Sequence, residues 1–365
     1  MIIQGRSAVV SSKLVGDTWL EISGNVISQV NTGIHPSPDQ IIDGVLIPGF
    51  IDIHCHGGGG KYFSASTSGE IHSVIQTHRG HGTTSIIASL VSEPVEVLKQ
   101  QIRRLAPFYE NGQIAGIHLE GPYLSTAKCG AHDPSLLLNP DINEIKEILD
   151  VAQGSIKMIT IAPELAGATE AIKYLNATGV LVAIGHTNGG FIDAATAANS
   201  GAQIVTHFMN AMDKSLSKDS LASFVVADER LSIELILDGH HISFATAREI
   251  YSALGSRTIF ITDAMAAAGS VDGAYVIGNL PVQVSEGVAR LEANLALAGS
   301  TLTMDQVFIN AVNELGLSVT QAVQATSTRA AKILKLSDRG EIAVGMRADL
   351  LSYNAAQSSI SLISE

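Results

Sequence analysis

Eight short runs of apolar and β-branched residues alternate with segments of helical periodicity through the middle of the chain. The candidate strands are residues 46–53, 85–90, 114–119, 157–161, 180–184, 204–206, 232–237 and 258–261. The helical segments between them include 93–105, 142–152, 164–176 and 191–199. This alternation predicts parallel βα units, and eight such units are what a (β/α)8 barrel requires. We therefore predict an α/β fold built on a TIM barrel.

An open doubly wound sheet is the rival architecture for the same alternation. It would be expected to carry a dinucleotide fingerprint after its first strand. The glycine run at 57–60 follows the first candidate strand, but it is not a G-x-G-x-x-G segment that opens a helix. The barrel is the favoured interpretation.

The two ends of the chain have a different pattern from the middle. Residues 1–46 alternate short apolar runs with Gly, Asn, Ser and Pro, and residues 340–365 do the same, which is typical of short strands and turns. We predict that both ends join in one small β-sandwich domain, and that residues 47–339 form the barrel.

The charge of the chain excludes several classes of protein. It has 35 acidic and 22 basic residues, a net charge of −13, and no basic stripe of the kind that binds nucleic acid. No apolar run approaches the ~18 residues of a membrane span, and the N-terminus does not resemble a signal peptide. Two cysteines, Cys55 and Cys129, are too few for a disulfide framework. We predict a cytoplasmic protein.

Polar residues stand at the carboxyl ends of most candidate strands. They are His54 and His56, His118 and Glu120, His186, His207, the segment from Asp238 to His241, and Asp263. In a barrel these ends converge on one mouth, where active sites are built. The pattern therefore predicts a single site.

The histidines of this set have the chemistry of metal ligands. His54 and His56 lie two residues apart on a strand, so their side chains point to the same face. An isolated His-x-His pair more often packs in the protein interior than binds a metal ion. Joined to Glu120, His186 and His207, it makes a ligand set suited to Zn²⁺ or a similar divalent ion.

Asp263 has two interpretations. A carboxylate at the end of the last strand can take a proton from a metal-activated water and later deliver it to a leaving group. The alternative is that Asp263 caps a helix beginning at Ala264. Capping would explain none of the surrounding histidines.

Several segments resemble the metal-dependent amidohydrolase superfamily. The segment IPGFIDIHCHG at 47–57 is similar to the opening of that superfamily. Four more resemble the deacetylases of N-acetylglucosamine 6-phosphate: HLEGPY at 118–123, GHT at 185–187, THFMNAM at 206–212 and TDAM at 262–265. With LAGS at 297–300 and the tail at 340–351, the resemblance covers nearly the whole chain. It implies a barrel with a small β domain and hydrolysis of the N-acetyl group of a 6-phosphorylated amino sugar.

The resemblance also implies roles for individual residues. The principal metal ligands of the family are matched by Glu120, His186 and His207, and a second-metal pair is matched by His54 and His56. The resemblance therefore implies one or two ions per subunit. Zn²⁺ is expected, with Fe²⁺ or another divalent ion as alternatives. Asp263 matches the catalytic acid/base. The matches to substrate contacts are Ala131, His132, Asn210, Ala211, His241, Leu297, Ala298 and Gly299. The fourth strand runs into Ala162 and Pro163 without the bridging lysine of many relatives, so Glu120 takes the bridging place. A homodimer is implied as well.

One departure from the family pattern concerns the substrate phosphate. The family has an Arg-Glu-Pro-Gly run after the segment at 206–212, and this chain has Lys218 where that arginine would stand. Lysine provides a point charge but not the planar two-pronged contact of arginine. Lys218 is thus a candidate phosphate contact, with a solvated loop charge as the alternative, and the need for phosphate and the identity of the sugar stay open.

Two other functions remain as alternatives. The chain could be a deacetylase of a related amino sugar or of N-acyl amino acids, or a catalytically silent barrel that acts as a binding module. The intact set of candidate ligands together with Asp263 favours an enzyme.

Overall fold

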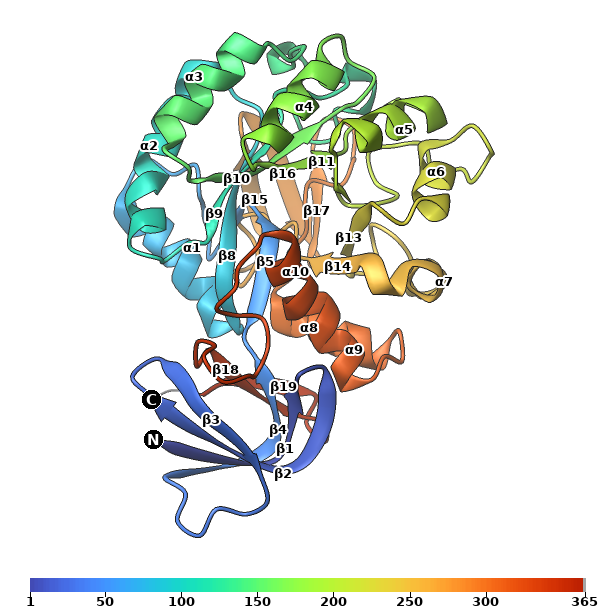
Figure 1. Ribbon diagram of the computed structural model, residues 1–365. Coiled ribbons are helices and arrows are strands. Elements are labelled where there is room, and N and C mark those ends of the chain that lie inside the picture. Colours follow the sequence, from blue (N-terminus) through green and yellow to red (C-terminus); the bar gives the residue numbers. More distant parts are fainter. Residues whose placement is uncertain (364–365) are drawn as a thin grey trace. The chain divides into compact units, whose positions relative to one another are not determined.

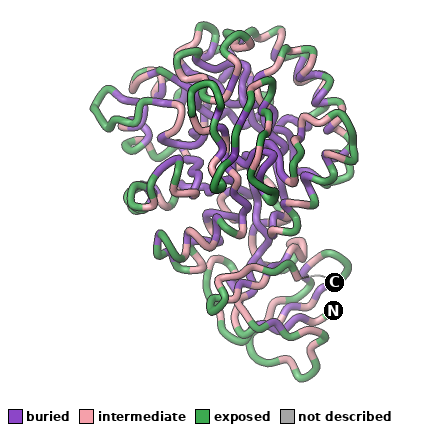
Figure 2. The backbone as a smooth tube through the Cα atoms, turned by 180° about the vertical axis from the view of Figure 1, so that it is seen from behind, coloured by how far each residue is buried: buried purple, intermediate pink, exposed green. Residues whose placement is uncertain are grey.

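Eight parallel strands form the predicted barrel (Figure 1). In sequence order they are β5 (Phe50–Cys55), β8 (Thr83–Leu90), β9 (Gly116–Glu120), β10 (Ile156–Ile161), β11 (Leu181–Ile184), β12 (Ile204–Val205), β13 (Ser232–Ile236) and β14 (Thr258–Ile261). Each overlaps one of the eight predicted runs. Figure 2 shows that buried residues run along these strands, as expected for a parallel sheet covered on both faces.

The last strand of the barrel meets the first just beyond its own end. The backbone N–H of Asp263 donates to the carbonyl of His54 at 2.9 Å, and Ala264 forms a parallel bridge with Cys55. Ala264 bridges Ser300 as well. Because the chain after Asp263 is extended and paired, no helix begins at Ala264, and the helix-cap interpretation of Asp263 is wrong.

Seven helices alternate with these strands. They are α1 (Ser68–Gly80), α2 (Val95–Glu110), α3 (Ile142–Ala152), α4 (Ala168–Ala177), α5 (Phe191–Ser200), α6 (Leu221–Ala227) and α7 (Phe244–Leu254). The bounds of α3 are as predicted, because the Asp141 side chain caps the helix. The prediction for α2 began two residues early, since Pro94 disfavours helical backbone at the residue before it. Among the described residues, no helix is long and apolar enough to span a membrane.

A three-stranded antiparallel sheet follows the barrel strands. It consists of β15 (Gly273–Ile277), β16 (Leu280–Ser285) and β17 (Val288–Leu291). Its buried face packs in a cluster with Met265 and Ala298. A short hairpin, β6 (Gly57–Gly58) with β7 (Lys61–Tyr62), follows β5. Both additions lie in segments that follow barrel strands at their carboxyl ends.

The computed structural model describes residues 1–363, so the last two residues of the predicted 340–365 segment lie outside the described part. It divides into two compact units. One unit comprises Ile53–Thr77 and Ile86–Leu302, and the other comprises Met1–Asp52, His78–Ser85 and the described residues 303–363. The domain boundaries at 46/47 and 339/340 stay predictions.

Both chain ends contribute to one six-stranded sheet, as the fold prediction required. Its order is β19-β18-β4-β1-β2-β3, and β1 and β4 pair in parallel. The strands are β1 (Ile2–Val10), β2 (Lys13–Ser23), β3 (Val26–Thr32), β4 (Gln40–Pro48), β18 (Leu350–Asn354) and β19 (Ser359–Leu362). Its core includes Leu20 from one end of the chain and Ile342 from the other. The same unit contains α8 (Met304–Asn313), α9 (Val319–Val323) and α10 (Arg329–Ile333).

Alternate barrel strands supply two different kinds of buried polar side chain. Hydroxyl groups come from β8, β10 and the residues directly after β12 and β14: Ser89, Thr160, Thr206 and Thr262. The other four strands supply His54, His118 and Glu234, and after β11 they supply Gly185. Barrel interiors are filled by such layers from alternate strands. This interior is polar directly beneath the mouth.

Gly185 is the one member of this set without a side chain. A Cβ atom built there would lie 2.6 Å from the Cβ of Thr206 and 3.0 Å from the Cγ2 of Thr160. The close approach of these two threonines, whose hydroxyls are 2.8 Å apart, leaves no room for a methyl group.

We predict that Gly185→Ala destabilises the barrel by about 1–3 kcal/mol, because overpacking forces the neighbouring threonines apart. The measurement is the free energy of unfolding from denaturant titration. Gly69→Ala is the matched control, since Gly69 lies in α1 with no atom within 4 Å of a built Cβ, and alanine there should be neutral or stabilising. An unchanged stability for Gly185→Ala would contradict this description of the interior.

Candidate metal centre and active site

The candidate site lies at the carboxyl ends of the barrel strands, where several residues adopt unusual backbone conformations. His186, His207 and Asp263 each follow a strand, and their φ angles are 47°, 27° and 49°. Residues other than glycine seldom adopt φ angles in this left-handed region. Such conformations gather at functional sites, where the surrounding structure holds them.

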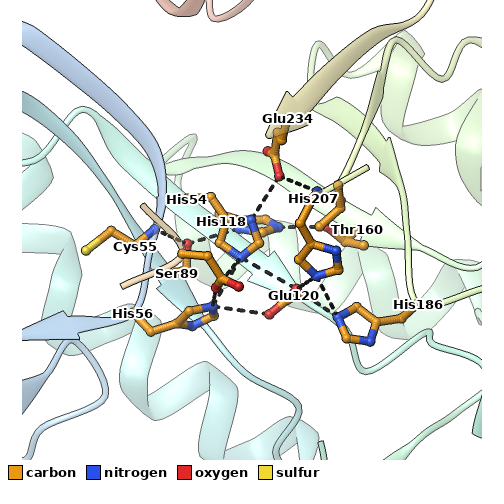
Figure 3. Close-up of polar contacts among 12 residues, drawn as sticks. His54, Cys55, His56, Ser89, His118, Glu120, Thr160, His186, His207 and Glu234 are labelled. Carbon is orange, nitrogen blue, oxygen red and sulfur yellow. Dashed lines mark hydrogen bonds and ion pairs between the residues drawn. The ribbon is translucent and has the colours of Figure 1, made fainter. Parts of the chain in front are cut away.

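The Glu120 carboxylate is the centre of the cluster (Figure 3). Its Oε1 atom lies 3.0 Å from the Nε2 atom of His186 and 3.1 Å from that of His207. Its Oε2 atom lies 3.2 Å from the Nε2 atom of His56 and 3.3 Å from that of His132. The carboxylate is buried, and its Oε1 atom also lies 3.5 Å from the Nε2 atom of His54, so five imidazoles surround it.

The outer contacts of two histidines determine which ring nitrogen carries the proton. The Nδ1 atom of His186 lies 2.9 Å from the backbone carbonyl of Lys128, and a carbonyl can only accept, so Nδ1 carries the hydrogen. The Nδ1 atom of His54 likewise faces the Glu234 carboxylate at 3.0 Å. In the neutral imidazole the other nitrogen then has a lone pair. Both Nε2 lone pairs therefore point inward, toward the cluster.

A cation between these groups would stabilise both the inward lone pairs and the carboxylates beside them. The Nε2 atoms of His186 and His207 are 3.0 Å apart, and those of His54 and His56 are 3.1 Å apart. Ligand atoms of a tetrahedral Zn²⁺ site with bonds of 2.0–2.1 Å are separated by about 3.3 Å. The donor atoms of His54, His56, Glu120 and Asp263 all lie within 4.8 Å of one another. These residues fit a divalent metal ion.

The charges around His54 also favour a cation in this cluster. Burial alone would lower the pKa of this imidazole, but the carboxylates of Glu120, Glu234 and Asp263 raise its pKa well above the ordinary value. The environment of His54 thus favours positive charge at this position.

His132 is close to Glu120 but has a different tautomer. The backbone N–H of Ser92 donates to its Nδ1 atom at 3.2 Å, so the hydrogen of the neutral ring is on Nε2. Burial lowers the pKa of His132 to about 4. At neutral pH the ring is uncharged, and its Nε2–H group is a hydrogen-bond donor directed toward Glu120.

Asp263 faces the histidines of the first strand. Its Oδ1 atom lies 3.3 Å from the Nε2 atom of His56 and 3.5 Å from that of His54. Burial would raise the pKa of Asp263, but these two imidazoles hold it below its ordinary value. The carboxylate is ionised at neutral pH and can accept a proton.

Two supporting residues lie beneath this cluster. His118 bonds through Nδ1 to the Ser89 hydroxyl at 3.0 Å and through Nε2 to the Thr160 hydroxyl at 2.8 Å. Its ring meets that of His54 edge-on, with centroids 4.6 Å apart. His118 therefore supports His54 without lining the cavity. The second residue, Glu234, was not singled out from the sequence, although a charged residue inside an otherwise apolar strand was a usable signal.

A cavity of about 220 Å³ opens over the cluster. The predicted site residues that line it are His56, Glu120, Ala131, His132, His186, His207, Asn210, Ala211, His241, Asp263, Leu297 and Gly299. Val91 and Ile277 add an apolar surface. The Nδ1 atom of His241 bonds to Asp238 at 2.7 Å, which leaves its Nε2 atom for a ligand.

Three predicted site residues do not line this cavity. His54 is completely buried, and Ala298 packs in the apolar cluster of the three-stranded sheet. Lys218 lies on the exposed loop between Met212 and Ser220. The structure therefore brings together all the candidate ligands but not the candidate phosphate contact.

Comparisons with known proteins agree with this geometry. Residues 45–361 match the model of the Amidohydrolase family. An N-acetylglucosamine-6-phosphate deacetylase from Lysinibacillus sphaericus is 32% identical, over 91% of this chain and 88% of its own length. An N-acetylgalactosamine-6-phosphate deacetylase from Escherichia coli O157:H7 is 29% identical, over 97% and 95%.

A solved structure extends the similarity to three dimensions. It is a variant of the N-acetyl-D-glucosamine-6-phosphate deacetylase from Mycobacterium smegmatis in complex with N-acetyl-D-glucosamine-6-phosphate. The two chains are 38% identical, and the match has a TM-score of 0.96 and covers 100% of this chain and 97% of the other.

We predict that a divalent ion stabilises the fold, because it relieves the repulsion among the inward lone pairs and carboxylates. Removing metal with a chelator should lower the midpoint of thermal unfolding. Restoring Zn²⁺ at 100 times its dissociation constant should add about 2.7 kcal/mol of stability. Purified protein without metal, whose midpoint is unchanged by added Zn²⁺ or Fe²⁺, would contradict the metal centre.

Proposed function

The chain belongs to the amidohydrolase family, and from that premise we propose that it hydrolyses the N-acetyl group of N-acetylglucosamine 6-phosphate to glucosamine 6-phosphate and acetate. The observation that carries the proposal is the set of inward-facing imidazoles around Glu120, with an ionised Asp263 beside them at the floor of a cavity. The named relatives support the choice of substrate.

The metal would be held by the residues that surround Glu120. We propose that this ion is Zn²⁺, with Fe²⁺ as the alternative. It would be bound by Glu120, His186 and His207, and His54 and His56 would be available for a second ion. A bound ion would polarise the amide carbonyl and lower the pKa of water. Glu120 contacts both histidine sets and uses both of its oxygens, which supports a bridging role for it.

Asp263 is proposed to move the proton. Its ionised carboxylate takes a proton from the attacking water as the new C–O bond forms at the acetyl carbon. When the C–N bond breaks, Asp263 returns this proton to the departing sugar nitrogen. The products are acetic acid and the amine, and at neutral pH the proton of the acid passes to the amine, which gives acetate and an ammonium group.

His132 and the apolar wall are proposed to orient the acetamide. The Nε2–H group of His132 points into the cavity near Glu120 and can donate to the carbonyl oxygen, on which negative charge develops. Val91 and Ile277 offer an apolar surface to the acetyl methyl group. The sugar and phosphate are assigned to Asn210, Ala211, His241 and the segment 297–299.

The identity of the sugar has a specific alternative. One relative that aligns over nearly the whole chain acts on N-acetylgalactosamine 6-phosphate according to its name, so a related 6-phosphorylated amino sugar is the second candidate substrate. A homodimer and a cytoplasmic location complete the proposal and await measurement.

The direct test is a substrate panel with acetate release as the readout. We predict the highest kcat/KM for the two 6-phosphorylated N-acetylhexosamines, lower values for N-acetylglucosamine, and no turnover of N-acetyl amino acids. Asp263→Asn should retain metal and lose about 10²–10⁴-fold in kcat, since general acid–base catalysis contributes this much.

The outcomes of the panel separate the alternatives. Preferential turnover of N-acetyl amino acids would replace the proposed substrate, and no turnover by metal-loaded protein would favour a silent binding module. A metal-replete Asp263→Asn variant with undiminished kcat would contradict the role of Asp263.

We predict a small effect for Lys218→Ala. As a solvated point charge, Lys218 contributes at most about 1 kcal/mol to binding a phosphate, so KM for the phosphorylated sugar should rise by no more than about fivefold, with kcat unchanged. Lys214→Ala on the same exposed loop is the matched control. Equal KM values for the two variants would remove Lys218 from the phosphate site, and a KM rise well beyond fivefold for Lys218→Ala alone would contradict its description as a solvated charge.

A further inference from the structure

Glu234 is the only ionisable residue within β13, and it is completely buried. A buried carboxylate is costly unless it is paired, so the partners of this side chain indicate why it is there. Its position in the barrel interior places it among the residues beneath the mouth rather than in the cavity itself.

A single oxygen of Glu234 contacts both groups of candidate ligands (Figure 3). Its Oε2 atom accepts from the Nδ1–H group of His54 at 3.0 Å and from the backbone N–H of His207 at 3.1 Å. The backbone of Glu234 is held in the same region, since its carbonyl accepts from Phe208 N–H at 2.9 Å. The carboxylate is therefore fixed relative to the segment that follows β12.

The two contacts have different consequences. The contact with Nδ1 keeps the hydrogen of His54 on that nitrogen, so the Nε2 lone pair faces Glu120, His56 and Asp263. The contact with the His207 amide holds the peptide of a residue whose φ angle is 27°. One buried oxygen thus orients a histidine of the first strand and the backbone of a ligand on the sixth.

We propose that Glu234 is a positioning residue that orients His54 for metal binding and couples this ring to the ligand set of His207. The inference rests on the metal centre in the proposed function but not on the identity of the sugar. Carboxylate partners of metal-binding histidines fix the ring and increase its basicity, and their loss weakens metal affinity by 10–100-fold.

A purely structural role for Glu234 makes a different prediction. If the carboxylate only filled the interior, its replacement would lower stability without a selective effect on the metal site. The second oxygen, Oε1, has no hydrogen-bond partner among the described residues. Glutamine can keep both hydrogen bonds through its carbonyl oxygen only by burying an NH2 group without an acceptor where Oε1 stood. It also removes the negative charge beside Nδ1 that stabilises a metal-bound His54 ring.

The test compares Zn²⁺ binding by the full chain across a double-mutant cycle. Zn²⁺ affinity is measured by competition with a chelating dye, and bound metal by elemental analysis, for the wild type, Glu234→Gln, His54→Asn and the double variant. We expect Glu234→Gln to weaken Zn²⁺ binding by about 10–100-fold. In the His54→Asn background the same change should have less than about a twofold further effect, because the ring through which Glu234 acts is gone.

Glu147→Gln is the matched control for this cycle. Glu147 pairs with Lys99 on the surface between α2 and α3, so its variant should bind Zn²⁺ as the wild type does. Glu234→Asp, which keeps the charge but retracts the oxygen by one methylene, provides a second test if the glutamine variant does not fold. It should lose affinity in the wild-type background and not in the His54→Asn background.

Three results would overturn the inference. They are wild-type Zn²⁺ affinity in Glu234→Gln, wild-type affinity in Glu234→Asp, or an equal loss in the presence and absence of the His54 ring. A wild-type protein that binds no metal would overturn the metal centre as well. A wild type that binds Zn²⁺ and releases acetate, alongside a Glu234→Gln variant with unchanged affinity, would overturn the inference alone.

Discussion

The Glu120 carboxylate attracts five histidine side chains to one buried point, and most of the polar architecture of the barrel follows from this arrangement. In their neutral forms, His54 and His186 donate their Nδ1–H groups to the Glu234 carboxylate and the Lys128 carbonyl. Their Nε2 lone pairs therefore face the Glu120 carboxylate. Such an arrangement is repulsive without positive charge at its centre. The residues with left-handed backbone at the strand ends, His186, His207 and Asp263, are also the ones whose side chains would face a cation bound in the cavity.

The barrel interior is adapted to hold this point in place. Alternate strands present hydroxyls and imidazoles, and His118 bonds to hydroxyls on both sides. The missing side chain of Gly185 permits the close approach of Thr160 and Thr206. Layers of this kind are apolar in an ordinary barrel. Here the polar layer gives the candidate ligand histidines neighbours that satisfy one another's hydrogen bonds.

The sequence predicted the barrel and the candidate ligands, because both leave local signals. Strand runs have a period and a length, and the ligands stand directly at the strand ends. The contact of Glu234 with His54 was not predicted, because the two residues are 180 positions apart in the sequence and only the closed barrel brings them together. The alternative in which Asp263 caps a helix was wrong because Ala264 pairs with Cys55 and Ser300, which lie far from it in the sequence. The tautomer of His132 depended on a backbone amide at Ser92, which no residue pattern encodes.

X-ray diffraction at the absorption edge of the bound metal tests the central claim most directly. The account predicts an anomalous peak bonded to Glu120, His186 and His207, with metal–nitrogen distances of about 2.0–2.1 Å for Zn²⁺. If a second ion is present, His54 and His56 should be among its ligands. A metal-loaded crystal of active protein with no anomalous peak beside Glu120 would contradict the account.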